Sequence, residues 1–116
     1  MPDLEMELKD GVFSVTVSGY CNETTGDSLV GEIKKVLEEG KARKFLMDFS
    51  ACEIVNSCGV AKVLDAVEMI GIDFQGKVII CGLNVTTKSF FDMVGVFDSA
   101  EFTSTLAEAR KFIKSA

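Results

Sequence analysis

Two short apolar runs, separated by a stripe of apolar residues at helical spacing, constrain the fold more than any other feature of this sequence. The runs cover residues 44–49 and 77–83, and neither alternates between apolar and polar side chains. Such runs are typical of strands covered on both faces of a sheet. The stripe between them predicts a helix that begins near Ser57 and stops at Gly71. A strand, a helix and a strand in this order predict a right-handed crossover between parallel strands.

The first part of the chain predicts an antiparallel hairpin. Apolar and charged residues alternate strictly over residues 3–9, which is typical of a half-exposed strand. Asp10 and Gly11 form a two-residue turn signal. The partner strand places Phe13, Val15 and Val17 on one face, and we expect it to end at Gly19.

Apolar spacing and glycine positions predict two further helices and one short strand. Apolar residues recur at helical spacing over residues 29–37, and Gly40 is well placed to close that helix. Another helix is expected over residues 86–94, closed by Gly95. A short strand is expected to follow at residues 96–97.

The last helix opens with a capping-box pattern, in which Thr105 is followed three residues later by Glu108. Its predicted core-facing residues are Leu106, Ala109, Phe112 and Ile113. The complete order is ββαβαβαβα. The sequence therefore predicts one α/β domain over residues 1–116, with a mixed, mostly parallel sheet, an N-terminal hairpin and about four helices.

The absence of histidine excludes many kinds of chemistry. Without histidine, the chain cannot form a Ser-His-Asp or Cys-His catalytic site or a metal site that needs imidazole. The four cysteines, at positions 21, 52, 58 and 81, contain no Cys-x-x-Cys pair. We therefore expect no enzyme activity, no metal and no cofactor.

The charge balance bears on partners and location. The formal net charge is −6, which disfavours binding to nucleic acid. No apolar stretch is long enough to span a bilayer, and the N-terminal residues lack the pattern of a secretory signal. We expect a cytoplasmic protein with no membrane partner and buried, reduced cysteines.

The segment after the first apolar run carries the residues that could have a function. We expect that strand to end at Phe49 and a loop over residues 50–56 to lead to Ser57 at a helix start. A phosphate on Ser57 would meet backbone N–H donors and the positive end of the helix dipole. On spacing alone, Asn56 and Ser57 are more typical of a simple helix cap, which only satisfies the amides of the first turn. Gly59 is unusual in a first helical turn and indicates either a close packing contact there or a backbone that needs the room.

Four segments in order resemble the signatures of a known family. They are residues 47–50 (Met-Asp-Phe-Ser), 56–60 (Asn-Ser-Cys-Gly-Val), 76–82 (Gly-Lys-Val-Ile-Ile-Cys-Gly) and 90–97 (Phe-Phe-Asp-Met-Val-Gly-Val-Phe). Together they resemble the STAS domain, and within it the small single-domain anti-sigma-factor antagonists of bacteria. The resemblance covers almost the whole chain.

The resemblance implies a switch between two proteins. In that family, an anti-sigma factor that is itself a GHKL-type serine kinase phosphorylates a serine of the antagonist. The unphosphorylated antagonist binds this kinase and releases a sigma factor. The phosphorylated antagonist cannot bind, and a phosphatase restores the unphosphorylated form. Ser57 matches the phosphorylated serine, and no small-molecule substrate is implied. The implied partner-binding surface comprises Tyr20, Asn22, Asn56, Ser57, Cys58, Gly59 and Asn84.

This sequence departs from the family pattern at the switch. Asn56 stands where the family has Asp, Cys58 stands where Ser or Thr is usual, and residues 20–22 replace an acidic stretch. The neutral surface leaves a second hypothesis open, in which the domain is a scaffold with a different partner and is not phosphorylated. A third hypothesis, an enzyme or a sensor of nucleotides or lipids, is disfavoured by the missing histidine and phosphate-binding glycine motifs.

Overall fold

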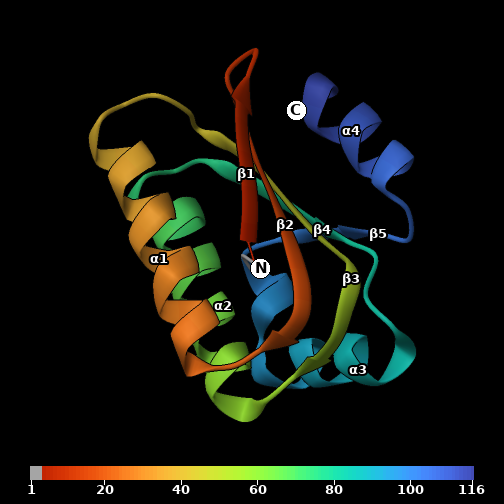
Figure 1. The fold of residues 1–116 in the computed structure, drawn as a ribbon. Helices are drawn as coiled ribbons and strands as arrows, with labels where there is room; N and C mark the ends of the chain where they lie inside the picture. The colour runs from red at the N-terminus through yellow and green to blue at the C-terminus, as the bar shows by residue number, and fades with distance from the viewer. Residues whose placement is uncertain (1–3) are drawn as a thin grey trace.

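Five strands form one mixed sheet in the computed structural model, which describes residues 4–116 (Figure 1). Their order across the sheet follows their order along the chain. The first two strands are antiparallel, and every other neighbouring pair is parallel. The strands are β1 (Leu4–Lys9), β2 (Val12–Cys21), β3 (Lys44–Val55), β4 (Lys77–Cys81) and β5 (Glu101–Thr103).

The predicted hairpin between β1 and β2 is confirmed. Asp10 and Gly11 have φ angles of 53° and 77°. A two-residue hairpin turn of type I′ requires positive φ at both of these positions. Leu8 therefore pairs with Phe13, and Leu4 pairs with Val17. The expected first residue of the strand, at position 3, lies outside the described residues.

Helices cover both faces of the sheet, as the predicted fold class requires. In Figure 1, α1 and α2 lie side by side against one face, and α4 lies against the other. A π-helical turn continues α2, and a 3₁₀ turn follows α3. These elements are α1 (Glu23–Glu38), α2 (Ser57–Glu68), the π-helical turn (Met69–Asp73), α3 (Val85–Val94), the 3₁₀ turn (Val96–Asp98) and α4 (Leu106–Ser115).

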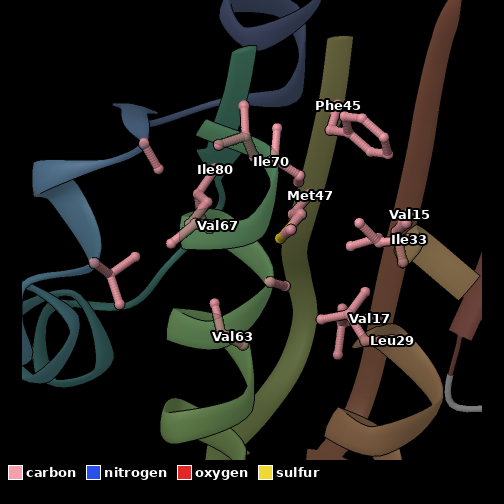
Figure 2. Close-up of a cluster of buried hydrophobic side chains, with 14 of the residues drawn as sticks. Val15, Val17, Leu29, Ile33, Phe45, Met47, Val63, Val67, Ile70 and Ile80 are labelled. Carbon is pink, nitrogen blue, oxygen red and sulfur yellow. The ribbon is translucent and has the colours of Figure 1, made fainter. Parts of the chain in front are cut away.

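The larger core lies between the sheet and the α1–α2 pair (Figure 2). In β3, Phe45 and Met47 point into this core, whereas Leu46 packs with Ile113 of α4 on the opposite face. All three β3 side chains are at most 2% exposed. The run is continuously apolar because both of its faces are covered. The residues labelled in Figure 2 are Val15, Val17, Leu29, Ile33, Phe45, Met47, Val63, Val67, Ile70 and Ile80.

Two strands are longer than the sequence predicts. The predicted ends at Gly19 and Phe49 are wrong, because β2 continues to Cys21 and β3 continues to Val55. The predicted loop over residues 50–56 is therefore mostly strand. The added parts pair with each other, with register shifts along the way. Residues 50–55 of β3 have no partner in β4, so most of their side chains are exposed and do not form an apolar run.

The C-terminal half requires further corrections. Residues 96–97 form a 3₁₀ turn, and the short strand comes later, as β5. The second helix does not stop at Gly71, because this residue lies within the π-helical turn. Phe112 is 39% exposed, although Ile113 beside it is buried. The predicted closure of α3 is confirmed, since Gly95 has a φ of 93°.

The cap of α4 is also confirmed. The Thr105 hydroxyl accepts a hydrogen bond from the Glu108 backbone N–H at 3.2 Å. The same hydroxyl donates a hydrogen bond to the Glu108 carboxylate at 3.1 Å. None of the helices within residues 4–116 has the length and apolar character needed to cross a bilayer. The same part of the chain contains no group of three or more Cys, Asp or Glu residues placed to hold a metal ion.

Candidate functional site

Three helices begin at the carboxyl edge of the sheet, and an asparagine caps each of them. Asn22 follows β2, Asn56 follows β3, and Asn84 lies three residues after β4. Their side-chain oxygens accept hydrogen bonds from backbone N–H groups of α1, α2 and α3 at 3.1, 2.8 and 2.8 Å. This edge therefore collects the positive ends of three helix dipoles.

Ser57 is the first residue of α2, and it is exposed. The preceding Asn56 is fixed on two sides, since its side chain accepts from Gly59 N–H and its backbone N–H donates to the Cys21 carbonyl at 3.1 Å. The N–H groups of Ser57 and Cys58 belong to the first helical turn and have no partner within the helix. An anion attached to Ser57 would lie beside these donors.

Tyr20 connects the end of β2 to the start of α2. Its hydroxyl oxygen accepts a hydrogen bond from the Asn56 side-chain amide at 3.3 Å. The Thr25 hydroxyl lies 3.3 Å from the Tyr20 carbonyl oxygen and 3.2 Å from the Asn22 side-chain oxygen. The predicted residues Tyr20, Asn22 and Asn56 are thus brought together, with Thr25 as a residue that the sequence pattern did not indicate.

Gly59 allows α2 to approach β2 closely. A β carbon at this position would overlap the Cys21 carbonyl oxygen and would also lie 3.1 Å from a methyl group of Val55. A glycine also allows α1 and α2 to approach each other closely. A β carbon on Gly26 of α1 would overlap the Lys62 side chain of α2. The close packing that the sequence predicts at Gly59 is therefore present.

Charge is sparse among these residues. Lys62, on the α1-facing side of α2, forms a salt bridge of 2.9 Å with Asp27. The hydrogen bond and the negative charge of Asp27 raise the pKa of Lys62, so this lysine stays protonated near neutral pH. The capping and hydroxyl groups around Ser57 are all neutral, as the sequence departures indicate.

A shallow groove brings Asn84 to the end of β3. It runs between the last residues of β3 and the first turns of α3, and Phe90 lies along it. Ile54 and Val85 also line it, with 56% and 84% of their surfaces exposed. The sequence pattern did not indicate these two residues. Ile54 lies in the predicted loop over residues 50–56, and Val85 lies just before the helix predicted over residues 86–94. The strand register provides the missing signal, since it pairs Ile54 with Tyr20.

Comparison with known families decides the classification. A family model described as the STAS domain matches residues 3–109. This chain belongs to the STAS domain family. The resemblance noted in the sequence is therefore confirmed.

Solved structures share the fold of this STAS domain. The unphosphorylated form of the anti-sigma-factor antagonist SpoIIAA has a TM-score of 0.80 at 15% identity, covering 97% of this chain and 99% of that chain. The phosphorylated form of Bacillus SpoIIAA gives 0.76 at 16% identity, covering 95% and 98%. An anti-sigma-factor antagonist from Mycobacterium paratuberculosis gives 0.78 at 23% identity, covering 96% and 92%.

Two of the predicted residues remain exposed side by side in this STAS domain. Ser57 and Cys58 both present their side chains at the start of α2, whereas Gly59 is buried against β2. The edge therefore offers one hydroxyl and one thiol on a rigid, capped helix start. Such an arrangement can accept a modifying group or contact a partner.

Proposed function

We propose that this STAS domain is an anti-sigma-factor antagonist that binds an anti-sigma serine kinase of the GHKL type and is switched off by phosphorylation of Ser57. One observation carries the proposal. Ser57 is exposed at the first position of a helix whose start is fixed to β2 through Asn56. SpoIIAA, which has the same fold, is known in both an unphosphorylated and a phosphorylated form.

The chemistry of the switch needs little from this chain. The partner kinase supplies ATP and the base. The Ser57 hydroxyl loses its proton to that base, its oxygen forms a bond to the γ-phosphorus, and the bond to the β-phosphate oxygen breaks to release ADP. A phosphatase reverses the outcome by hydrolysing the phosphoserine with water. The antagonist itself acts as a binding module and needs no metal, cofactor or catalytic residue of its own.

The phosphate would change the surface in two ways. It brings nearly two negative charges to a patch whose capping and hydroxyl groups are neutral. It also adds acceptor oxygens that the N–H groups of Ser57 and Cys58 can bind, which holds the charge at the surface. A partner that packs against the neutral patch must then desolvate this charge, so phosphorylation weakens binding.

The proposed partner surface combines the polar caps with exposed apolar residues. It comprises the predicted residues Tyr20, Asn22, Asn56, Ser57, Cys58 and Asn84, with Gly59 buried beneath them, and we add the exposed Ile54 and Val85. The net charge of −6 favours a protein partner over nucleic acid, and a kinase that controls transcription places the protein in the cytoplasm.

Binding to the kinase tests this proposal. The wild type, Ser57→Ala, Ser57→Asp and the control Ser104→Asp are used to capture partners from the native cell, and mass spectrometry identifies the partners and any phosphate on Ser57. Ser104 is exposed before α4 and lies outside the proposed surface. We expect Ser57→Asp alone to lose a GHKL-type kinase, by about tenfold or more. Equal capture by all four proteins would refute the switch.

The neutral edge favours a second candidate function. Asn56 and Tyr20 make a hydrogen bond that does not depend on charge. A scaffold that associates constitutively through this edge would need no phosphate. Partner capture that is insensitive to Ser57→Asp, with no phosphate on Ser57 in protein from the native cell, would support the scaffold instead of the switch.

A further inference from the structure

A second concave site lies at the end of the sheet opposite Ser57. It is a groove between the β1–β2 hairpin and α4, and its cavity volume is about 530 Å³. In Figure 1 the hairpin turn and α4 lie at the upper end of the view, and the first turns of α1 and α2 lie at the lower end. Lys44 begins β3 at this groove, and Ser57 comes after the last residue of the same strand.

Basic side chains line the groove from three different elements. Lys9 comes from β1, Lys44 from β3, and Arg110 and Lys114 from α4, where they are one turn apart. Glu7 and Asp10 are the acidic residues that also line it. Four positive and two negative charges give a local excess of 4 − 2 = +2, on a chain whose net charge is −6.

The salt bridges within residues 4–116 are Lys41–Glu39 and Lys62–Asp27, and neither includes one of these four cations. The positive charges outnumber the two carboxylates of the groove, so an added anion would balance the local excess. Arg110 and Lys114 are exposed and can both turn toward such an anion.

Three apolar residues lie at the base of the groove, among six charged residues and Ser14. Two of the three are Leu46 of β3 and Ile113 of α4, and each is only 2% exposed. Val12 of β2 lies beside them. Small-molecule sites measure roughly 300–1,000 Å³, and the volume of this groove lies within that range. The size thus fits a small ligand better than it fits an extended polymer.

We propose that this groove binds a small organic anion, with its body beside Val12 and its phosphate, sulfonate or carboxylate group between Arg110 and Lys114. Lys9 and Lys44 complete the positive rim. This site is separate from Ser57, and it does not depend on the phosphorylation switch. A ligand in this groove would bind at the end of the sheet opposite Ser57.

Fluorescence titration with anilinonaphthalene sulfonate, which combines an apolar body with one anionic group, tests the proposal. The variants are Arg110→Gln/Lys114→Gln and, as a second pair in case the first affects folding, Lys9→Gln/Lys44→Gln. The matched control is Lys34→Gln/Lys35→Gln, which removes the same charge from exposed positions of α1. The neutral analogue N-phenylnaphthylamine measures the contribution of the anionic group.

We expect saturable binding to the wild type, with Kd raised at least about tenfold in each groove pair and less than about twofold in the control pair. The neutral analogue should bind at least about tenfold more weakly. Amide NMR signals of residues 7–14 and 106–114 should shift on addition of the probe. Equal weakening by the control pair, equal binding of the neutral analogue, or shifts confined to other regions would overturn the proposal.

A lipid head group has the same anionic chemistry as a free ligand, and sedimentation with phosphatidylglycerol vesicles distinguishes the two. We expect the wild type to stay in the supernatant while it binds the soluble probe. Sedimentation of the wild type that is lost in Arg110→Gln/Lys114→Gln, without saturable binding of the probe, would assign these cations to a membrane surface and overturn the proposal.

Discussion

Gly59 of α2 lies directly against the carbonyl oxygen of Cys21 at the end of β2. A β carbon on Gly59 would overlap that oxygen, so no other residue fits without a shift of the helix or the strand. The Cys21 oxygen also accepts the backbone N–H of Asn56, the residue that caps the helix. A single carbonyl group therefore sets both the distance between α2 and β2 and the residue at which α2 begins. Both together determine the position of Ser57.

Replacing Gly59 with alanine should destabilise the domain by about 1–3 kcal/mol, because the added methyl group forces α2 away from β2. Gly31 provides the matched control, since it lies in α1 with nothing within 4 Å of the β carbon that would be added. Gly31→Ala should instead stabilise the domain, by about 0.5–1 kcal/mol. Urea unfolding measures both, and an equal effect of the two substitutions would contradict the packing argument.

The cap of α2 should tolerate a carboxylate better than a methyl group. Asn56→Ala removes the acceptor for the Gly59 N–H and should cost about 1 kcal/mol of unfolding free energy. Asn56→Asp keeps an acceptor, gains from the helix dipole and can accept from the Tyr20 hydroxyl, so it should cost less than the alanine variant.

Urea unfolding at neutral pH compares these two variants with Tyr20→Phe. This third variant removes only the hydroxyl of a half-exposed side chain, so its cost should stay below about 0.5 kcal/mol. A loss in Asn56→Asp as large as in Asn56→Ala would show that the side-chain amide, and not the cap acceptor, holds this edge together.

The elements that could be predicted from sequence are those determined by neighbouring residues. The turn at Asp10 and Gly11, the closure of α3 at Gly95 and the capping box at Thr105 each depend on a few adjacent residues. Gly59 also gave a usable signal, because a glycine in a first helical turn has a cost that a close contact explains.

The features that sequence could not predict depend on contacts between distant segments. The second half of β3 is a strand only because β2 runs beside it, and its own residues carry no apolar pattern. Ile54 joins the candidate site through its pairing with Tyr20 in β2. The groove on the other end joins Lys9 to Arg110 across most of the chain, and no local spacing indicates that they share a cavity.

The two adjacent apolar residues near the end of α4 should differ sharply in their contribution to stability. Ile113 is 2% exposed and packs with Leu46, so Ile113→Ala should cost about 2–5 kcal/mol. Phe112 is 39% exposed, and Phe112→Ala should cost less than roughly half of that. Thermal and urea unfolding compare the stability of the two variants. A larger loss of stability in Phe112→Ala would indicate that Phe112 belongs to the core, as the sequence predicts.

Cys81 should make the stability of the domain depend on pH in the alkaline range. Burial raises the pKa of its thiol from 9.0 to about 12, and the nearby charge and hydrogen bond of Asp48 act in the same direction. In the unfolded chain the thiol loses its proton near pH 9, whereas the folded protein retains it. The unfolded state thus binds fewer protons above pH 9, and stability falls as pH rises toward 12.

The contribution of this one thiol is obtained as the difference between the wild type and variants that lack a single cysteine. Cys81→Ala should lose less stability than the wild type between pH 9 and 11, by at most about 1.4 kcal/mol for each pH unit. Cys58→Ala, which removes an exposed thiol, should follow the wild-type curve. Urea unfolding at successive pH values gives the three curves. Parallel curves for all three proteins would mean that the folded state does not hold the Cys81 proton.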